Sequence, residues 1–306
     1  MILCSGEALI DMLPRETGAG ERAFAPFPGG AVFNTSIALG RLGVATGFFS
    51  GLSSDLFGDI LTKSLSKAKV DSSMAARSSR PTTLAFVTLT NGQASYVFYD
   101  ENTAGRMLGL DDLPTLSENV STLFFGGISL MVEPCAQAYE ALLLREQENR
   151  VIMIDPNIRQ SFISDEATYR TRISRMMAAS DLVKVSDEDL AWLTGCDDLQ
   201  KGASDVLEAG TKVVCVTEGA EGVTAFSAMH TVRVPANKVD VVDTVGAGDT
   251  FNAGFMAALS DADVLTKDKI ATLDEATIHA ALTLGARAAA VTVSRAGANP
   301  PTRAEL

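Results

Sequence analysis

One short run of the sequence combines a carboxylate with a glycine turn: Asp243-Thr244-Val245-Gly246-Ala247-Gly248-Asp249. The residues that follow place Phe251, Phe255 and Leu259 on one face of a predicted helix over 250–259. In the turn, Gly246, Ala247 and Gly248 would let several backbone N–H groups point into one concavity at the helix start, where the helix dipole favours negative charge. The sequence therefore predicts an anion-binding turn.

Asp249, the last residue of this turn, has two interpretations. Between a transferring phosphoryl group and an acceptor hydroxyl, a carboxylate would take the hydroxyl proton as the oxygen attacks. Alternatively, Asp249 caps the helix and satisfies its free amides without doing chemistry. Spacing alone favours the cap, because short glycine-rich turns are common. The Walker pattern G-x-x-x-x-G-K-[ST] is absent and G-x-G-x-x-G is not completed, which argues against those two kinds of nucleotide site.

The composition narrows the class of protein. The 306 residues, 46% of them hydrophobic, suffice for one large domain or one domain with a small appendage. The 25 Lys and Arg against 38 Asp and Glu give a net charge of −13, and no stretch gathers the basic residues into a stripe. Such a surface repels a phosphate backbone, so we expect no nucleic acid partner. A free nucleotide is still allowed, because local amides and one or two cations decide that contact.

The four cysteines Cys4, Cys135, Cys196 and Cys215 are scattered along the chain, without a C-x-x-C pair or a nearby histidine cluster. Their spacing fits neither a disulfide framework nor a zinc site, and favours buried thiols in a reducing compartment. The start of the chain lacks a basic segment, and no run of about eighteen uncharged apolar residues occurs. We expect a cytoplasmic protein without a membrane partner.

The elements that must position these residues follow from the hydrophobic pattern. Short apolar runs alternate with amphipathic stretches, which is typical of an α/β doubly wound fold with a mostly parallel sheet and helices on both faces. The predicted strands are Thr122–Ile128, Arg150–Asp155, Asp181–Val185, Lys212–Thr217 and Val239–Val242. The predicted helices are Glu133–Gln147, Ala167–Ala178 and Ala276–Val291, besides the helix after Asp249.

One segment interrupts this alternation. Two predicted strands, Leu84–Thr90 and Ala94–Tyr99, are joined by Asn91-Gly92, a strong signal for a tight hairpin. With the segment after Asp11 this hairpin would form a small sheet that covers the site as a lid, made of about 11–27 and 82–106. The alternative is an edge hairpin on the main sheet, and the residues leave both open. No linker divides the chain, so we expect a single domain over 1–306.

The resemblance to a known family rests on two runs. The run Asp243 to Phe251 resembles the C-terminal signature of the ribokinase-like (PfkB) carbohydrate kinases, and Gly29-Gly30-Ala31-Val32-Phe33-Asn34-Thr35-Ser36-Ile37-Ala38-Leu39-Gly40-Arg41-Leu42-Gly43 resembles their N-terminal signature. The similarity continues in order over essentially the whole chain. It implies a doubly wound α/β domain with a small β-sheet lid, ATP as phosphoryl donor, Asp249 as catalytic base, and Gly246, Ala247 and Gly248 as the anion hole.

The same resemblance implies the sugar contacts. Asp11, Gly29, Gly30 and Asn34 match positions that hold sugar hydroxyls in the family, and a carboxylate with an amide can supply several hydrogen bonds to a polyol. Without the family, Asp11 would be a turn residue at a strand end and Asn34 a polar residue on an exposed helix face.

Further matches concern the nucleotide. Asp155-Pro156-Asn157-Ile158-Arg159 resembles the family's D-x-N-x-R and implies that Arg159 lies near the phosphates, although a surface ion pair is the alternative. The loop Thr217-Glu218-Gly219-Ala220-Glu221-Gly222 resembles the family's nucleotide loop. The resemblance therefore implies nucleotide-binding roles for Lys184, Thr217, Gly219 and Gly222.

The cation sites are where this chain departs from the family. The family commonly has N-x-x-E after the strand that ends at Lys184-Val185, whereas this chain has Ser186-Asp187-Glu188-Asp189. Asp189 would still organise Mg²⁺ through water, but Ser-x-x-Asp is also a helix-capping arrangement. The closing segment 291–298 resembles a segment near a monovalent-cation loop in some members, so K⁺ is an expected accessory ion to which no ligand is assigned.

The substrate follows from two segments that look most like bacterial and plant fructokinases, namely 6–11 and 95–106. They imply transfer of the ATP γ-phosphate to the 6-hydroxyl of fructose, with Phe98 or Tyr99 stacking on the sugar and Arg106 reaching its edge. Packing and solvent roles are the alternatives for these side chains. A 2-keto-3-deoxygluconate kinase, a ribokinase, a nucleoside kinase and a silent sugar or nucleotide sensor remain as alternatives. Family members often dimerise through the lid, which makes a homodimer an expectation.

Overall fold

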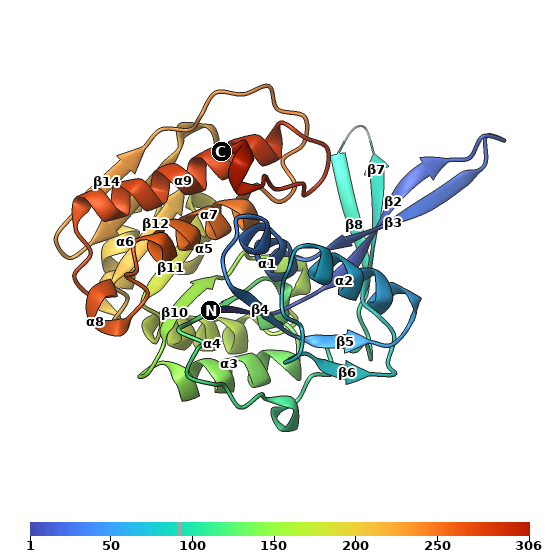
Figure 1. Ribbon diagram of the computed structural model, residues 1–306, viewed down its shortest axis with the longest axis horizontal. Helices are drawn as coiled ribbons and strands as arrows, with labels where there is room; N and C mark the ends of the chain where they lie inside the picture. The colour runs from blue at the N-terminus through green and yellow to red at the C-terminus, as the bar shows by residue number, and fades with distance from the viewer. Residues whose placement is uncertain (91–92) are drawn as a thin grey trace.

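The computed structural model describes residues 1–90 and 93–306 and is built around one large sheet (Figure 1). Its strand order is β14-β13-β12-β11-β10-β9-β1-β4, and the six strands from β12 to β4 pair in parallel while β13 and β14 are antiparallel. The strands are β1 (Ile2–Ser5), β4 (Thr46–Phe49), β9 (Thr122–Gly126), β10 (Val151–Asp155), β11 (Leu182–Ser186), β12 (Val213–Thr217), β13 (Val223–Ser227) and β14 (Thr231–Val234).

Both faces of this sheet are buried along its six parallel strands, which explains why these strands are mostly apolar. In β10, Val151 and Met153 belong to one hydrophobic core and Ile152 and Ile154 to a second core on the opposite face. This alternation follows from the two-residue period of a strand. A continuous apolar run is therefore what a parallel strand between two helix layers requires.

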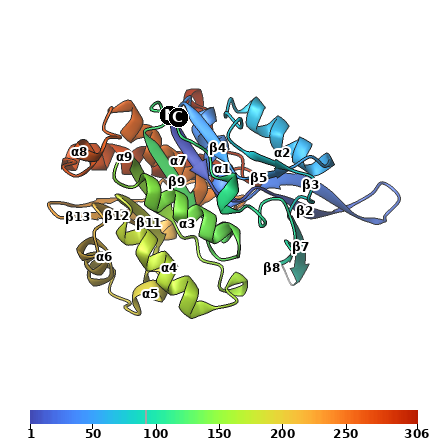
Figure 2. The same cartoon turned by 90° about the horizontal axis from the view of Figure 1, so that it is seen from below.

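Helices cover the two faces (Figures 1 and 2). Five helices contribute to the first core: α1 (Ala31–Arg41), α2 (Leu56–Lys67), α7 (Ala247–Asp261), the short α8 (Lys267–Ile270) and α9 (Glu275–Val293). Those that contribute to the second core are α3 (Cys135–Glu146), α4 (Glu166–Ala178), α5 (Asp187–Thr194) and α6 (Leu199–Glu208). The short 3₁₀ turns are η1 (Leu110–Asp112), η2 (Ile128–Leu130), η3 (Gln160–Phe162), η4 (Gly219–Glu221) and η5 (Arg303–Glu305).

The helix that carries Asp249, α7, is held by close packing against α9. A Cβ atom on Gly254 would lie 2.8 Å from the Cα of Gly285, so the two helices approach at their backbones. Phe255 is fully buried beside this contact. Helix α9 is long and apolar enough to cross a membrane by composition alone, but its Ile278 and Leu282 belong to the first core, as in many buried core helices.

The hairpin belongs to a second, four-stranded sheet that projects from the large one (Figures 1 and 2). Its order is β3-β2-β7-β8, so the edge-hairpin alternative is wrong because β7 pairs with β2 rather than with the main sheet. The strands are β2 (Leu9–Glu16), β3 (Arg22–Gly29), β7 (Leu84–Thr90) and β8 (Gln93–Tyr99), and a separate pair consists of β5 (Gly51–Ser53) and β6 (Ala76–Ser78). The predicted turn residues Asn91 and Gly92 lie outside the described residues.

The register of this small sheet defines two faces. Asp11 pairs with Phe27 on one side and Ala85 on the other, and Ala85 pairs with Phe98, so these four side chains share a face. The opposite face carries the edge-to-face contacts of Phe86 with Phe24 and Tyr99. The face of Asp11 is turned toward the large sheet, because Phe98 packs edge to face against Phe162 of η3 with ring centroids 4.3 Å apart.

Most predicted strands and helices are confirmed to within two residues, but one strand is wrong. The segment 239–242 is an irregular connection between β14 and α7, with Val241 and Val242 each 63% exposed. The amides of Val242 and Asp243 both donate to the carbonyl oxygen of Val293, at the end of α9. A run of valines has strand propensity, but here the segment crosses the end of a helix and has no neighbouring strand to pair with.

Candidate active site

The start of α7 has the free backbone amides that an anion site requires. Gly246 adopts φ +79° at the N-cap position, a conformation that suits glycine, and the helix begins at Ala247. No side chain caps this helix. Within the described part of the chain, the amides of Gly248 and Asp249 donate to no acceptor. Two free amides at the positive end of a helix dipole can bind a phosphoryl oxygen.

Asp249 lies inside the first turn of α7, three residues later than a capping position, so the capping interpretation is wrong. Its side chain is 8% exposed, and its Oδ2 accepts a hydrogen bond of 2.9 Å from Nδ2 of Asn34. The hydroxyl of Thr35 donates to the backbone carbonyl of the same aspartate at 3.2 Å. Two successive residues of α1 therefore hold Asp249 in place.

The environment of Asp249 suits a proton acceptor near neutral pH. Burial raises its pKa from 3.8 to about 7, and the hydrogen bond from Asn34 opposes this shift. Among the nearby charges, Asp155 and Glu7 raise the pKa and Lys184 lowers it. A carboxylate with a pKa close to the working pH is both available in its ionised form and basic enough to accept a proton.

A buried ion pair lies behind the anion site. Nζ of Lys184 is 3.0 Å from Oδ2 of Asp155, and Nδ2 of Asn252 donates to the same oxygen at 2.7 Å. Each of the three side chains is at most 6% exposed. Nζ of Lys184 also lies 3.1 Å from the point where a Cβ on Gly248 would be. Lys184 therefore places a buried positive charge next to the free amides of Gly248 and Asp249.

The predicted sugar-binding residues gather between α1 and the small sheet. Asp11 of β2 faces Gly29, the last residue of β3, and its Oδ2 occupies the space that a side chain at Gly29 would need. Gly30 follows with φ +105° as the N-cap residue of α1, which places Asn34 one turn into that helix. Burial raises the pKa of Asp11 to about 6. The structure therefore brings Asp11, Gly29, Gly30, Asn34 and Asp249 to one region.

Phe98 and Arg106 have different surroundings. Phe98 shares the face of Asp11 and contacts Phe162, as described above. The Nη1 atom of Arg106 is 3.7 Å from Oδ2 of Asp100, and its Nε donates to the carbonyl of Glu133 at 3.2 Å. In this conformation its guanidinium is engaged by these two partners, in a small pocket that it shares with Glu7 and Ser129.

The residues assigned to the nucleotide lie at the carboxyl ends of the strands. Thr217 ends β12 and donates through Oγ1 to the carbonyl of Val185 at 3.3 Å. Gly219 and Gly222 belong to the turn through η4 into the antiparallel strand β13. This loop is therefore next to the end of β11, the strand that carries Lys184.

Arg159 and Asp189 lie near one another beyond β10 and β11. Arg159 is exposed and its Nη1 donates to the carbonyl of Ile158. Oδ2 of Asp189 accepts from the amide of Ile158 at 3.2 Å, and its own amide donates to Oγ of Ser186 at 3.0 Å. The helix-capping interpretation of Ser186 and Asp189 is thus confirmed, and burial, followed by the charge of Asp155, raises the pKa of Asp189.

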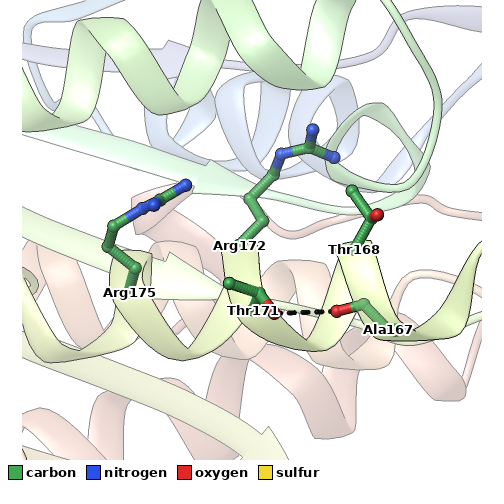
Figure 3. Close-up of a pocket in the computed structure, with 5 residues that line it drawn as sticks. All are labelled: Ala167, Thr168, Thr171, Arg172 and Arg175. Carbon is green, nitrogen blue, oxygen red and sulfur yellow. Dashed lines mark hydrogen bonds between the residues drawn. The ribbon is translucent and has the colours of Figure 1, made fainter.

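A second hollow lies away from these residues, along one side of α4 (Figure 3). Arg172 and Arg175 point to the same side of the helix there, but both are paired with Glu140, and Arg172 also with Glu133. No residue predicted to act in the site lines this pocket.

Sequence reasoning missed several residues that the structure places in the site. Asp155 and Asn252 form the ion-pair network, Thr35 holds the backbone of Asp249, and Glu7 contacts the start of α1. Asp155 and Glu7 did carry a signal, because each is an acidic residue at or near the end of a buried apolar strand: Asp155 ends β10, and Glu7 follows the end of β1 by two residues. Asn252 and Thr35 have no such signal, since polar residues within a helix are usually exposed.

Comparisons with known proteins show which proteins this chain resembles. The chain is 54% identical to a fructokinase of Rhizobium leguminosarum bv. trifolii over 275 residues, which covers 90% of this chain and 84% of that protein. It is 33% identical to fructokinase-1 of Zea mays over 316 residues, covering 100% and 96% of the two chains.

Solved structures and a family model complete the comparison. A Xylella fastidiosa fructokinase with bound ATP superimposes with a TM-score of 0.89 at 29% identity, covering 99% of this chain and 96% of that one. A Vibrio cholerae O395 fructokinase double mutant, described with fructose, ADP and potassium ion bound, gives 0.85 at 25% identity, covering 97% and 93%. The model of the pfkB family carbohydrate kinases matches residues 1–305. The chain therefore belongs to the pfkB family of carbohydrate kinases.

Proposed function

We propose that this chain is an ATP-dependent fructokinase in which Asp249 accepts the proton of the fructose 6-hydroxyl. The observation that carries the proposal is the buried carboxylate of Asp249, fixed by Asn34 beside the open amides of α7. A binding protein without catalysis would gain nothing from a carboxylate at a phosphate site, because the two charges repel. The 54% identity to the Rhizobium fructokinase supports fructose as the acceptor.

The transfer proceeds in one displacement. The 6-hydroxyl oxygen forms a bond to the γ-phosphorus, its proton passes to Asp249, and the bond from the γ-phosphorus to the β,γ-bridging oxygen breaks to release ADP. The sugar is held by Asp11 and Asn34, which offer a carboxylate and an amide to its hydroxyls. Phe98 on the same sheet face supplies an apolar surface for the ring, and Arg106 reaches the sugar edge after leaving Asp100.

The chain's own groups also stabilise the phosphoryl oxygens. The amides of Gly248 and Asp249 bind the charge that develops in the transition state, with Ala247 and Gly246 shaping the turn. Lys184 adds a positive charge next to Gly248, and Arg159 binds the phosphates from the loop after β10. Thr217, Gly219 and Gly222 hold the rest of the nucleotide at the end of β12. Because these groups are fixed before substrate binds, little reorganisation is needed during transfer.

The residues present fit a magnesium ion held mainly by phosphates and water. Among the described residues, no group of three or more His, Cys, Asp or Glu side chains could hold a metal ion. Asp189 uses one carboxylate oxygen for the amide of Ile158, which leaves the other for a metal-bound water. Such an ion would neutralise the phosphates. K⁺ is proposed as an accessory ion near 243 and 297, where the amide of Gly297 donates to Asp243 at 2.9 Å.

We place the protein in a reducing compartment, the cytoplasm. All four cysteines carry free thiols, and Cys4, Cys135 and Cys215 are buried. Burial raises the pKa of the Cys215 thiol to about 12, with Lys184 opposing the shift. Protonated, buried thiols are inert packing groups.

The substrate is tested by ADP release with Mg-ATP and fructose, ribose, 2-keto-3-deoxygluconate, glucose or adenosine. Turnover is expected with fructose alone, to be lost when EDTA removes Mg²⁺, and to rise when KCl replaces NaCl. Preference for another member of the panel would keep the kinase and exclude fructose. No turnover with any acceptor would contradict the proposed function and favour a sugar or nucleotide sensor.

Asp249→Asn is expected to lower kcat in the same assay by about 10²- to 10⁴-fold, because a carboxamide cannot accept the proton. The melting temperature should not fall, since the substitution removes a buried charge. The matched control is Asp263→Asn, just beyond the end of α7, where the aspartate side chain is 93% exposed. Near-normal turnover of Asp249→Asn would remove this residue from the role of base.

The pH profile should report the raised pKa of Asp249. We expect kcat/KM with fructose to rise with pH and level off above about 7, because the protonated carboxyl below that pH cannot accept a proton. A second, lower limb is expected near 6 from Asp11, whose carboxylate binds hydroxyls. A profile that is flat from pH 5 to 8 would show that Asp249 has an ordinary pKa and would contradict this assignment of the base.

The small sheet is proposed to act as a lid over the sugar and as a dimer contact. Its outer face exposes Phe24 (43%), Val97 (51%) and Tyr99 (61%), an apolar row that a second copy of this chain would cover. Sedimentation is expected to give a dimer for the native chain and a monomer for Tyr99→Glu. The control Met229→Glu changes an 82% exposed residue elsewhere. A monomeric native chain would contradict the dimer.

A further inference from the structure

Glu7 is a buried carboxylate that occupies the start of α1. It follows β1 and Gly6 and is 9% exposed. Its Oε1 accepts from the amide of Ala31 at 2.8 Å and, more weakly, from that of Val32 at 3.5 Å. Its own backbone carbonyl accepts from the amide of Phe33 at 3.3 Å. The first amides of a helix have no acceptor within the helix. Three of them in α1 therefore donate hydrogen bonds to Glu7, a residue distant in the sequence.

This capping is needed because the N-cap residue of α1 is Gly30, which has no side chain and supplies no cap. The other carboxylate oxygen of Glu7, Oε2, accepts from the amide of Ser129 at 3.3 Å, in the turn η2 after β9. Glu7 thus ties α1 to the carboxyl ends of two neighbouring strands, β1 and β9. A negative charge at this helix end is also favoured by the helix dipole.

We propose that Glu7 is a positioning residue for the phosphoryl transfer, which fixes α1 so that Asn34 stays on Asp249. Asn34 lies one turn into α1, where its own amide donates to Gly30 at 2.8 Å. From there Asn34 and Thr35 make the two contacts with Asp249. The inference rests on the proposed function, since it assigns no new reaction but explains how the base is held.

Few charged groups surround the carboxylates of Asp249 and Glu7. Asp249 is influenced by Glu7, Asp155 and Lys184. Glu7 forms no ion pair within the described residues, and shares its pocket with Asp100, Arg106 and Cys135. Its carboxylate is therefore stabilised by amides rather than by a cation. Burial raises the pKa of Glu7, which those hydrogen bonds oppose.

Loss of Glu7 has two effects on Asp249 that act in opposite directions. Removing the charge of Glu7 alone would lower the pKa of Asp249. Freeing α1 would withdraw the hydrogen bond of Asn34, which is the strongest influence that lowers this pKa. If Glu7 positions Asn34, the second effect prevails and the pKa of Asp249 rises further. The direction of the shift therefore separates positioning from a simple loss of charge.

The test uses Glu7→Ala, with fructose and Mg-ATP. We expect kcat to fall on the order of 10²-fold, as for a misplaced catalytic group, with KM for ATP within twofold because the amides of α7 are untouched. The acid limb of kcat/KM should move to higher pH. In a crystal structure of the variant, the distance between Nδ2 of Asn34 and Oδ2 of Asp249 should exceed 3.5 Å.

Glu7→Gln serves if the alanine variant does not fold. A carboxamide offers one acceptor oxygen where both carboxylate oxygens of Glu7 accept from amides, so the same changes are expected at smaller size. The matched control is Glu140→Ala, which removes another buried glutamate (8% exposed) from its pairs with Arg172 and Arg175. It should lower the melting temperature and leave both kcat and the acid limb unchanged.

Three outcomes would overturn the proposal: wild-type kcat in the Glu7 variants, an acid limb that is unmoved or shifted to lower pH, or an Asn34–Asp249 hydrogen bond that persists in the crystal. Each would make Glu7 a structural residue only, with the kinase assignment intact. Failure of the proposed function looks different, because the native chain itself would then not phosphorylate fructose. The crystallographic distance would still decide the role of Glu7 in that case.

Discussion

The hydrogen bond between Asn34 and Asp249 joins residues that are 215 positions apart in the chain. It connects the start of the fold, where β1 leads into α1, with the helix that follows the last strand of the large sheet. Both helices lie on the same face and contribute to the same hydrophobic core. Every strand of the large sheet except β1 lies between these two helices in the chain. The acceptor site and the anion site are therefore products of one folded core rather than of two local motifs.

Burial of the Asp249 carboxylate at this contact carries a cost in stability, which the hydrogen bond from Asn34 opposes. Burial raises the pKa of Asp249 above its value in an unfolded chain, from 3.8 to about 7. The folded chain then binds a proton between these two pH values that the unfolded chain has released. The stability that this group contributes is complete below about pH 4 and is lost as the pH rises through 7. Asp249 therefore contributes least to the stability of the fold when it is ionised, which is the form that accepts a proton. The packing of α7 against α9 has to offset this loss of stability.

The central strands β9 to β12 of the large sheet could be predicted from the sequence because each is an apolar run buried on both faces. The small sheet could be predicted as a hairpin, but only the pairing of β7 with β2 decided where that hairpin goes. The start of α7 was misplaced by three residues because Ala247 and Gly248 look like turn residues, whereas Gly246 alone makes the turn. The valines at 239–242 misled for a related reason. Their propensity favours a strand, but a strand also needs a partner, which propensity does not report.

The site residues also include some that the sequence could predict and some that it could not. Asp249 and Asn34 were indicated by two runs with a recognisable pattern, so a match to a family was enough. The role of Glu7 depends on a contact between residues distant in the sequence, because its side chain caps a helix that begins 24 residues later. No local sequence pattern encodes such a contact.

The contacts of Arg106 could not be predicted from the sequence either. Its guanidinium pairs with Asp100 and donates to the carbonyl of Glu133. Oδ2 of Asp100 is buried and makes no hydrogen bond among the described residues, so it would also lose this ion pair if Arg106 moved to a sugar. Under the proposed sugar contact of Arg106, selectivity would depend on whether the sugar offers Asp100 a hydroxyl in exchange, a balance of hydrogen bonds that residue types alone do not reveal.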